Sequence, residues 1–233
     1  MTRGEKLFEM PTLRGSGEFI LPSDKEAEER IFALYEQLEP WQKEEGFIWY
    51  FQAFHQCQAI VDEFSDLDLS HDQVAGIIAA LSPQASWEQN IDYVRMLLSE
   101  GTAPTLGHAV KSAMEIRFGA EPISVLHASH RNNWKVRAFH SNISSPDTSE
   151  DVTIDRHAWN LIFKDTKAIK RAGRRIPLVD YRWAEERYRT VAGAIGCKPH
   201  QLQAATWLRW KPYAAGDRPN RTPYMQHVLF ESV

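Results

Sequence analysis

Three segments of this chain begin with the same helix-start signature, in which a serine is followed three residues later by a glutamate or glutamine. The segments are Ser23-Asp24-Lys25-Glu26, Ser70-His71-Asp72-Gln73 and Ser86-Trp87-Glu88-Gln89. In such a capping box each of the two side chains satisfies a backbone N–H that the helix leaves unpaired. Apolar residues at helical spacing follow each box, and no run alternates apolar and polar residues over more than a few positions. The sequence therefore predicts an all-α protein.

Helical spacing also predicts where further helices lie and which one is central. Pro40 separates the helix at 23–38 from one that runs from about residue 41 to residue 64. Residues 74–81 are apolar nearly all round, which predicts a buried helix at the centre of the fold. Other helices are expected at the following residues: 86–98, 106–118, 122–128, a segment around Lys135, a segment entered at Asp155, 180–195 and 199–211.

The composition indicates a globular protein that needs neither a membrane nor a metal. At 233 residues the chain fits one domain with a sizeable core. It has no apolar run long enough to span a bilayer and no signal-peptide core, so we expect a cytoplasmic location and no membrane contact. Cys57 and Cys197 lack metal-ligand spacing, and two cysteines exclude a four-cysteine iron–sulfur site. We expect buried free thiols, no metal, no cofactor and, by default, a monomer.

The net charge of −4 conceals a strong asymmetry along the chain. Residues 1–100 carry 7 basic and 19 acidic side chains, whereas residues 101–233 carry 20 basic and 12 acidic ones. In residues 156–221 the basic side chains are interleaved with tryptophans and tyrosines. That combination is typical of surfaces that contact phosphates and stack on bases, so we expect DNA as a partner. The alternative is a basic face paired with the acidic half of the same molecule.

An amine and a carboxylate lie 20 residues apart, each at the start of an apolar-patterned helix. Lys135 belongs to the segment Asn132–Ile143, and Asp155 precedes a helix after a short polar loop. One reversal of the chain would bring them together. A lysine beside an aspartate can supply a nucleophile and a proton acceptor. The alternative is that Asp155 is a helix N-cap and Lys135 lies on a solvated face.

Three short motifs occur in the order and context of a known family. Leu81-Ser82-Pro83-Gln84-Ala85-Ser86, with Asn90 four residues on, resembles a segment of the helix-hairpin-helix (HhH-GPD) DNA glycosylase superfamily. Trp134-Lys135-Val136-Arg137-Ala138 resembles that family's lysine helix, and Ile154-Asp155-Arg156-His157 resembles its aspartate stretch. The resemblance covers roughly residues 70–165 and implies a DNA-glycosylase-like all-α fold.

The resemblance also implies roles for individual residues. Gln84 would fill the space left by a flipped nucleotide, Lys135 would attack C1′, and Asp155 would accept a proton or stabilise positive charge on the sugar. Arg156 belongs to the aspartate motif, and His157 would contact a phosphate or serve as a structural histidine. Three tryptophans beside the motifs are candidates for stacking on an extruded base, with core packing as the alternative: Trp87, Trp134 and Trp159.

The hairpin that precedes the lysine departs from the family pattern. The family has two glycines there, whereas this chain has Ser129-His130-Arg131-Asn132-Asn133. Asn132 and Asn133 are of the residue type that best tolerates positive φ after glycine, and Arg131 could bind the phosphate in place of backbone N–H groups. We therefore expect a degenerate helix-hairpin-helix.

These patterns predict a domain organisation and several candidate functions. We expect an irregular arm at 1–22, a glycosylase-like helical core at 23–165, and a basic helical extension at 166–233 packed on that core. The leading function is an enzyme that flips a nucleotide in DNA and cleaves its N-glycosidic bond. One alternative is the related phage-type amino acid:DNA transferase, which acts on activated 5-hydroxymethyluracil in DNA. Two others are a non-catalytic DNA-binding module and a helical protein without nucleic acid.

Overall fold

The structure, a computed structural model, describes residues 20–129, 134–171 and 176–215, and over these residues it contains helices and no strand. This confirms the all-α prediction. The elements are α1 (Asp24–Glu36), α2 (Pro40–Glu63), a short 3-10 helix η1 (Ser65–Leu67), α3 (His71–Leu81), α4 (Trp87–Glu100), α5 (Gly107–Arg117), α6 (Pro122–Ser129), α7 (Trp134–Ser144), α8 (Arg156–Ile162), α9 (Ala168–Arg171), α10 (Leu178–Ile195) and α11 (Pro199–Ala215).

The three predicted capping boxes are all present, at the starts of α1, α3 and α4. In α4, for example, the Ser86 hydroxyl accepts from Gln89 N at 3.2 Å, and Gln89 Oε1 accepts from Ser86 N at 3.2 Å. Gly101 ends the same helix with φ +77°, a conformation that glycine adopts without steric cost. These local signals explain why the predicted and observed helix starts agree.

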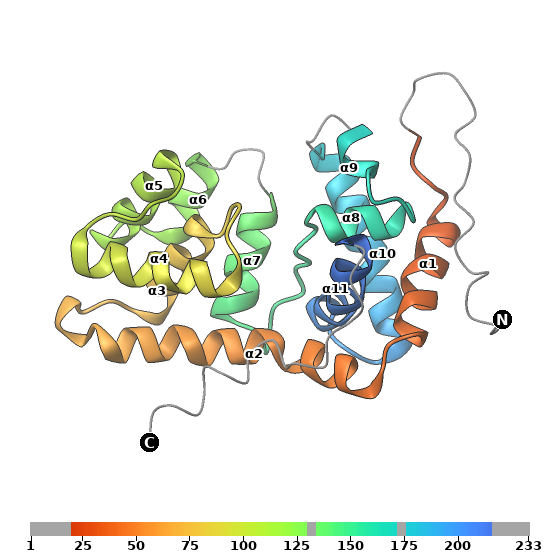
Figure 1. The fold of residues 1–233 in the computed structure, drawn as a ribbon, viewed down its shortest axis with the longest axis horizontal. Coiled ribbons are helices and arrows are strands. Elements are labelled where there is room, and N and C mark those ends of the chain that lie inside the picture. Colours follow the sequence, from red (N-terminus) through yellow and green to blue (C-terminus); the bar gives the residue numbers. More distant parts are fainter. Residues whose placement is uncertain (1–19, 130–133, 172–175, 216–233) are drawn as a thin grey trace.

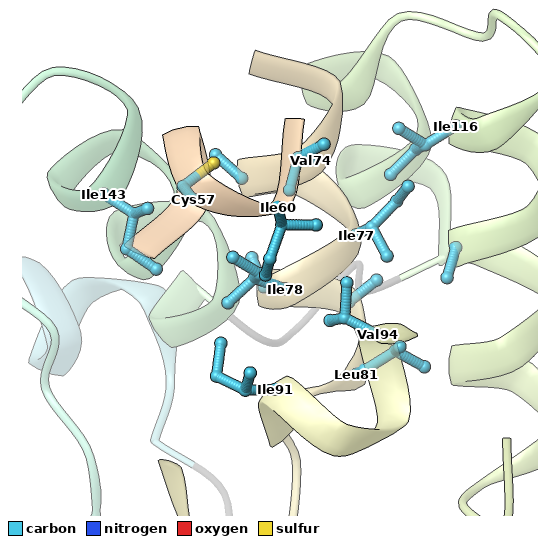
Figure 2. Close-up of a cluster of buried hydrophobic side chains, with 14 of the residues drawn as sticks. Cys57, Ile60, Val74, Ile77, Ile78, Leu81, Ile91, Val94, Ile116 and Ile143 are labelled. Atoms are coloured by element: carbon cyan, nitrogen blue, oxygen red, sulfur yellow. The ribbon is translucent and has the colours of Figure 1, made fainter. Parts of the chain in front are cut away.

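The helices form two groups, each around its own hydrophobic cluster (Figure 1). The first cluster is built mainly from α2–α7, and the predicted central helix α3 is buried from Val74 to Leu81. Figure 2 shows side chains of α2, α3, α4, α5 and α7 meeting there, with Cys57 and Ile60 of α2 beside Ile77 and Ile78 of α3. The Cys57 thiol is buried as predicted, whereas Cys197 is half-buried.

The second cluster joins the two ends of the described chain. It contains side chains from α1, from the 152–163 segment, and from α10 and α11. The helices after residue 165 therefore do not form a separate layer on a finished core. They complete the same hydrophobic cluster as α1, so the clusters do not follow the predicted boundary at residue 165. The predicted arm at 1–22 lies almost entirely outside the described residues.

Helix α2 runs under both groups and packs closely on α11 (Figure 1). The close approach depends on Gly46, where an added Cβ would lie 2.2 Å from the Cα of Ala205. The contact holds α11 beside the N-terminal half of α2, and this places both helices at the boundary between the two groups.

No helix in the described ranges is long and apolar enough to cross a bilayer. No cluster of three or more histidine, cysteine, aspartate or glutamate side chains in those ranges could hold a metal ion.

Candidate functional site

A cavity of about 160 Å³ lies where the two groups of helices meet. Helices α4 and α7 belong to one group, α8 and α11 to the other, and α2 passes beneath both (Figure 1). The lining side chains come from five parts of the chain: Trp49 and Tyr50 of α2; Ser82, Ala85, Ser86, Trp87 and Asn90 around the start of α4; Lys135 and Phe139 of α7; Thr153 and Asp155; and Gln203, Ala204, Trp207 and Lys211 of α11.

Asp155 is held in one orientation by three N–H donors. It is the N-cap of α8, and its Oδ1 accepts from the backbone N–H of His157 and of Ala158, both at 2.8 Å. Its Oδ2 accepts from the indole N–H of Trp207 at 3.2 Å. The predicted alternative, that Asp155 is an N-cap, is therefore correct. A carboxylate has about four acceptor positions, so Oδ2 can still accept a bond from the cavity.

Lys135 lies in the first turn of α7, and its side chain lines the same cavity as Asp155. The structure therefore brings together the amine and the carboxylate that the sequence separates by 20 residues. Among the described residues, no carboxylate oxygen lies within the 4.0 Å of the Lys135 amine that an ion pair requires. Lys135 and Asp155 therefore line the same cavity without forming an ion pair with each other.

Aromatic side chains form one wall of the cavity. The Trp49 ring contacts Tyr50 and Trp87 edge-on, with centroids 4.8 and 5.2 Å apart. Phe139 of α7 completes the group, with its ring centroid 6.0 Å from that of Trp49. On the other side, the Lys211 amine lies 4.4 Å from the ring centroid of Trp207. The cavity therefore combines flat apolar walls with two cations and one carboxylate.

Tyr50 and Thr153 of the cavity lining belong to a connected set of buried hydrogen bonds. Tyr50 donates to Thr153 Oγ1 at 2.9 Å, which also accepts from Asn142 Nδ2 at 3.2 Å. Ser149 in turn donates to Asn142 Oδ1 at 2.6 Å. Burial raises the pKa of the Tyr50 phenol well above its usual range, so this group stays protonated. The network ties α2 and α7 to the 149–153 segment and so fixes the position of Asp155.

His157 lies behind Asp155 rather than in the cavity wall. Its Nε2 accepts from Arg156 Nε at 3.1 Å, and its ring packs edge-on against Trp207. Burial lowers the pKa of His157, and the Asp155 carboxylate partly opposes that effect. Three cations lower the same pKa further: Arg156, Lys211 and Lys135. The His157 imidazole is therefore neutral where it packs against Trp207 at the start of α8.

Gln84 lies in the loop between α3 and α4, next to three residues that line the cavity. It is exposed and has φ +69°, a left-handed conformation that is uncommon outside glycine. Its neighbours Ala85 and Ser86 belong to the cavity wall, but Gln84 itself does not. The loop therefore presents this side chain to solvent beside the cavity.

The structure corrects some of the predicted site residues. Trp159 has no exposed surface and packs against Phe163 in the second hydrophobic cluster, so it cannot stack on a base. Trp134 packs beside the same cluster with the Arg137 guanidinium over its ring, and it lines no part of the cavity. Of the three candidate tryptophans, only Trp87 lies in the cavity wall.

The remaining predicted residues divide into three sets. Trp87 and Asn90 line the cavity together with Lys135 and Asp155. Arg156 is exposed at the start of α8 and, like His157, lines no part of the cavity. The hairpin residues Arg131, Asn132 and Asn133 lie outside the described residues.

Sequence reasoning missed the contributions of α2 and α11. Trp49 and Tyr50 belong to a dense aromatic segment of the predicted helix at 41–64, and aromatic density alone is equally typical of core packing. Trp207 and Lys211 are one helical turn apart, and a tryptophan and a lysine at that spacing in a basic segment were the available signal. No motif joins either helix to Lys135 or Asp155 in the sequence.

The comparisons with known proteins give one family and no individual relative. A model of a protein family described as a family of unknown function (DUF7178) matches residues 21–214. No curated protein and no solved structure gives a significant match. The matched range includes both groups of helices and every residue that lines the cavity.

Proposed function

The chain belongs to this family of unknown function, DUF7178, and we propose that it is an enzyme that takes one base of DNA out of the strand and cleaves its N-glycosidic bond. The observation that carries the proposal is the convergence of Lys135 and Asp155 on one aromatic-walled cavity. An amine and a carboxylate held apart across an open space are the groups that such a reaction needs on the sugar of a flipped nucleotide.

The size and walls of the cavity support a single base as its occupant. A cavity of roughly 150 Å³ can accept one benzene-sized ring, and this cavity measures about 160 Å³. Trp49, Trp87 and Phe139 offer flat apolar surfaces of the kind on which extruded bases stack. Enzymes that act on a base must extrude it, because its reactive atoms are inaccessible within the duplex.

The chemistry assigns a separate role to each charged group. The Lys135 nitrogen attacks C1′ and forms the N–C1′ bond, while the bond between C1′ and the base breaks. The base leaves with the electron pair of that bond and takes up a proton from water. The sugar ring then opens at C1′ to give an imine with Lys135, which borohydride would reduce and which water hydrolyses to release the lysine. Asp155 accepts the proton that the lysine nitrogen releases, and its negative charge stabilises the positive charge that develops on the sugar.

Two further features support DNA as the substrate. Lys211 and Arg156 lie near the cavity, and cations in such positions neutralise phosphates on either side of an extruded nucleotide. Gln84 can donate and accept hydrogen bonds, so from the adjacent loop it is suited to contact the base left without a partner.

The test combines DNA binding with chemistry on a panel of substrates. Fluorescence anisotropy on duplex and single-stranded DNA should give an affinity that falls at least about tenfold between 50 and 200 mM salt. Duplexes that carry single modified bases are then assayed for released base and, with borohydride, for a covalent adduct at Lys135. Asp155→Asn and Lys135→Gln should abolish release, whereas Lys111→Gln, at an exposed lysine on α5, should not change it.

Each outcome bears on the proposal. Absence of DNA binding at low salt overturns it. Binding without release from any substrate, together with a nucleoside product of higher mass after incubation with activated 5-hydroxymethyluracil in DNA, would replace cleavage by the transferase reaction. Full activity of Asp155→Asn would remove the assigned proton acceptor from the mechanism.

A further inference from the structure

The segment that leads into Asp155 passes through the interior of the protein outside any helix. Residues 152–154 are buried, with no side chain more than 5% exposed, and the described part of the chain offers no strand to pair with them. A buried backbone has to bond its N–H and C=O groups within the protein. Turns and side chains from other elements must therefore supply the partners for this segment.

Two tight turns supply some of these partners, and Tyr181 of α10 bridges the first of them. Ile154 N donates to Val152 O, and Asp155 N donates to Thr153 O, both at 2.9 Å. Each bond closes a three-residue turn. The Tyr181 hydroxyl donates to Val152 O at 2.8 Å and accepts from Ile154 N at 3.1 Å. One side chain therefore contacts both ends of the turn that precedes Asp155.

The contacts from α10 are buried and involve two successive turns of that helix. Tyr181 is 4% exposed, and burial raises the pKa of its phenol well above the usual range. The Glu185 carboxylate raises the same pKa further, so the phenol keeps the proton that it donates. Four residues on, Glu185 Oε1 accepts from Val152 N at 3.4 Å. Helix α10 thus holds the backbone of the segment, whereas Tyr50 of α2 holds the Thr153 side chain.

We propose that Tyr181 positions Asp155 by bridging the turn that leads into it. Asp155 follows Ile154 directly, so a shift of the turn would move the carboxylate relative to Lys135. This role differs from that of Trp207, which bonds the carboxylate itself. The inference rests on the proposed function, in which Asp155 is the proton acceptor, and deepens it. It assigns a part in the reaction to α10, none of whose described residues lines the cavity.

The test reads the position of Asp155 without requiring any reaction. Asp155 Oδ1 accepts from the backbone amides of His157 and Ala158, so their hydrogen exchange reports whether the carboxylate stays in place. In Tyr181→Phe, NMR on the full-length protein should show exchange at these two amides faster by about fivefold or more. Amides of α3 in the other cluster, such as Ile78, should change less, because a general loss of stability would accelerate all of them alike.

The matched control is Tyr188→Phe on the same helix. Tyr188 is fully buried, but its hydroxyl donates to none of residues 152–158, so both exchange and base release should match the wild type. Tyr181→Phe should slow single-turnover base release about tenfold or more and leave duplex DNA affinity within about twofold of the wild type. If Tyr181→Phe does not fold, Glu185→Leu removes the acceptor for Val152 N and should accelerate exchange at the same two amides.

The two readouts separate this inference from the proposed function. Unchanged exchange at the start of α8 in Tyr181→Phe, or equal acceleration throughout α3, overturns the positioning role and leaves the proposed function standing. Exchange that is faster only around Asp155 supports the positioning role. Absence of base release by the wild type from every substrate overturns the proposed function, and the exchange measurement still decides whether Tyr181 holds Asp155.

Discussion

At the scale of single residues, the position of Asp155 depends on a tryptophan 52 residues further along the chain. The backbone of α8 fixes one carboxylate oxygen, and the Trp207 indole fixes the other. A carboxylate that must receive a proton and face a positive sugar works best in one orientation, because reorganisation during the reaction costs free energy. Trp207 is therefore a positioning residue in the proposed reaction.

We predict that Trp207→Phe slows base release about tenfold or more. The variant keeps an aromatic ring in the cavity wall but removes one hydrogen bond to a charged group, which contributes roughly 1.5–3 kcal/mol. Single-turnover rates on the substrate found in the panel would measure the effect. Trp183→Phe is the matched control, because the Trp183 indole also donates to a carboxylate, Asp24, outside the cavity. Equal rates for the two variants would contradict the role of Trp207.

Gln84 shows a conflict between local stability and the proposed contact with DNA. Its positive φ costs a non-glycine residue roughly 1 kcal/mol. We predict that Gln84→Gly raises the free energy of unfolding by up to about 1 kcal/mol and weakens duplex DNA binding. Gln84→Ala should weaken binding equally without the gain in stability, because alanine keeps the strain. Urea denaturation and anisotropy measure the two effects, and a stabilised variant with unchanged DNA binding would remove Gln84 from the site.

At the scale of secondary-structure elements, the crossing of α2 and α11 brings both helices to the cavity. We predict that Gly46→Ala destabilises the protein by roughly 3 kcal/mol, because its Cβ would collide with the backbone of Ala205. Gly193→Ala on α10 is the control: it has open space around it, and alanine in a helix interior should add up to about 1 kcal/mol. Urea denaturation of both variants would decide the question. A small loss of stability in Gly46→Ala would mean that α2 and α11 can move apart to accommodate the added methyl group.

The helices were predictable from the sequence because their signals are local. Each serine box places its own partner three residues away, and Gly101 at the end of α4 and Pro40 at the start of α2 are equally local signals. The meeting of Lys135 with Asp155 was predicted from their positions at two helix starts and from a family resemblance, and the structure places both side chains in the lining of one cavity. No sequence pattern, by contrast, distinguishes the buried Trp159 from Trp207, which lines the cavity. Their burial depends on how α8 and α11 pack, and no local pattern encodes that packing.

At the scale of the whole molecule, helices from the two ends of the described chain pack together in the second hydrophobic cluster. Because α1, α10 and α11 share that cluster, the acidic and basic halves of the sequence are packed together rather than separated. Some of the opposite charges pair directly: Arg187 of α10 contacts Glu28 of α1 at 3.1 Å. Lys135 of α7 and Lys211 of α11 are the basic side chains that line the cavity.

Two buried histidines make the stability of this packed molecule depend on pH. Burial lowers the pKa of both His157 and His200. His200 lies in the first turn of α11, and its Nε2 is 2.9 Å from the Pro146 carbonyl oxygen. In the unfolded chain both histidines take up protons near pH 6.5, whereas in the folded protein they do so only at lower pH. The unfolded state therefore binds more protons below about pH 6.5, and acid favours unfolding.

We predict that stability is fully present above about pH 6.5 and falls as the pH decreases below that value. Urea denaturation at pH 7.5, 6.5 and 5.5 should give a decreasing midpoint. The double variant His157→Gln/His200→Gln should show a weaker decrease than the wild type, because it lacks the two groups whose protonation differs between the states. His55→Gln, at an exposed position of α2, should retain the full decrease. An unchanged pH dependence in the double variant would assign the effect to other groups.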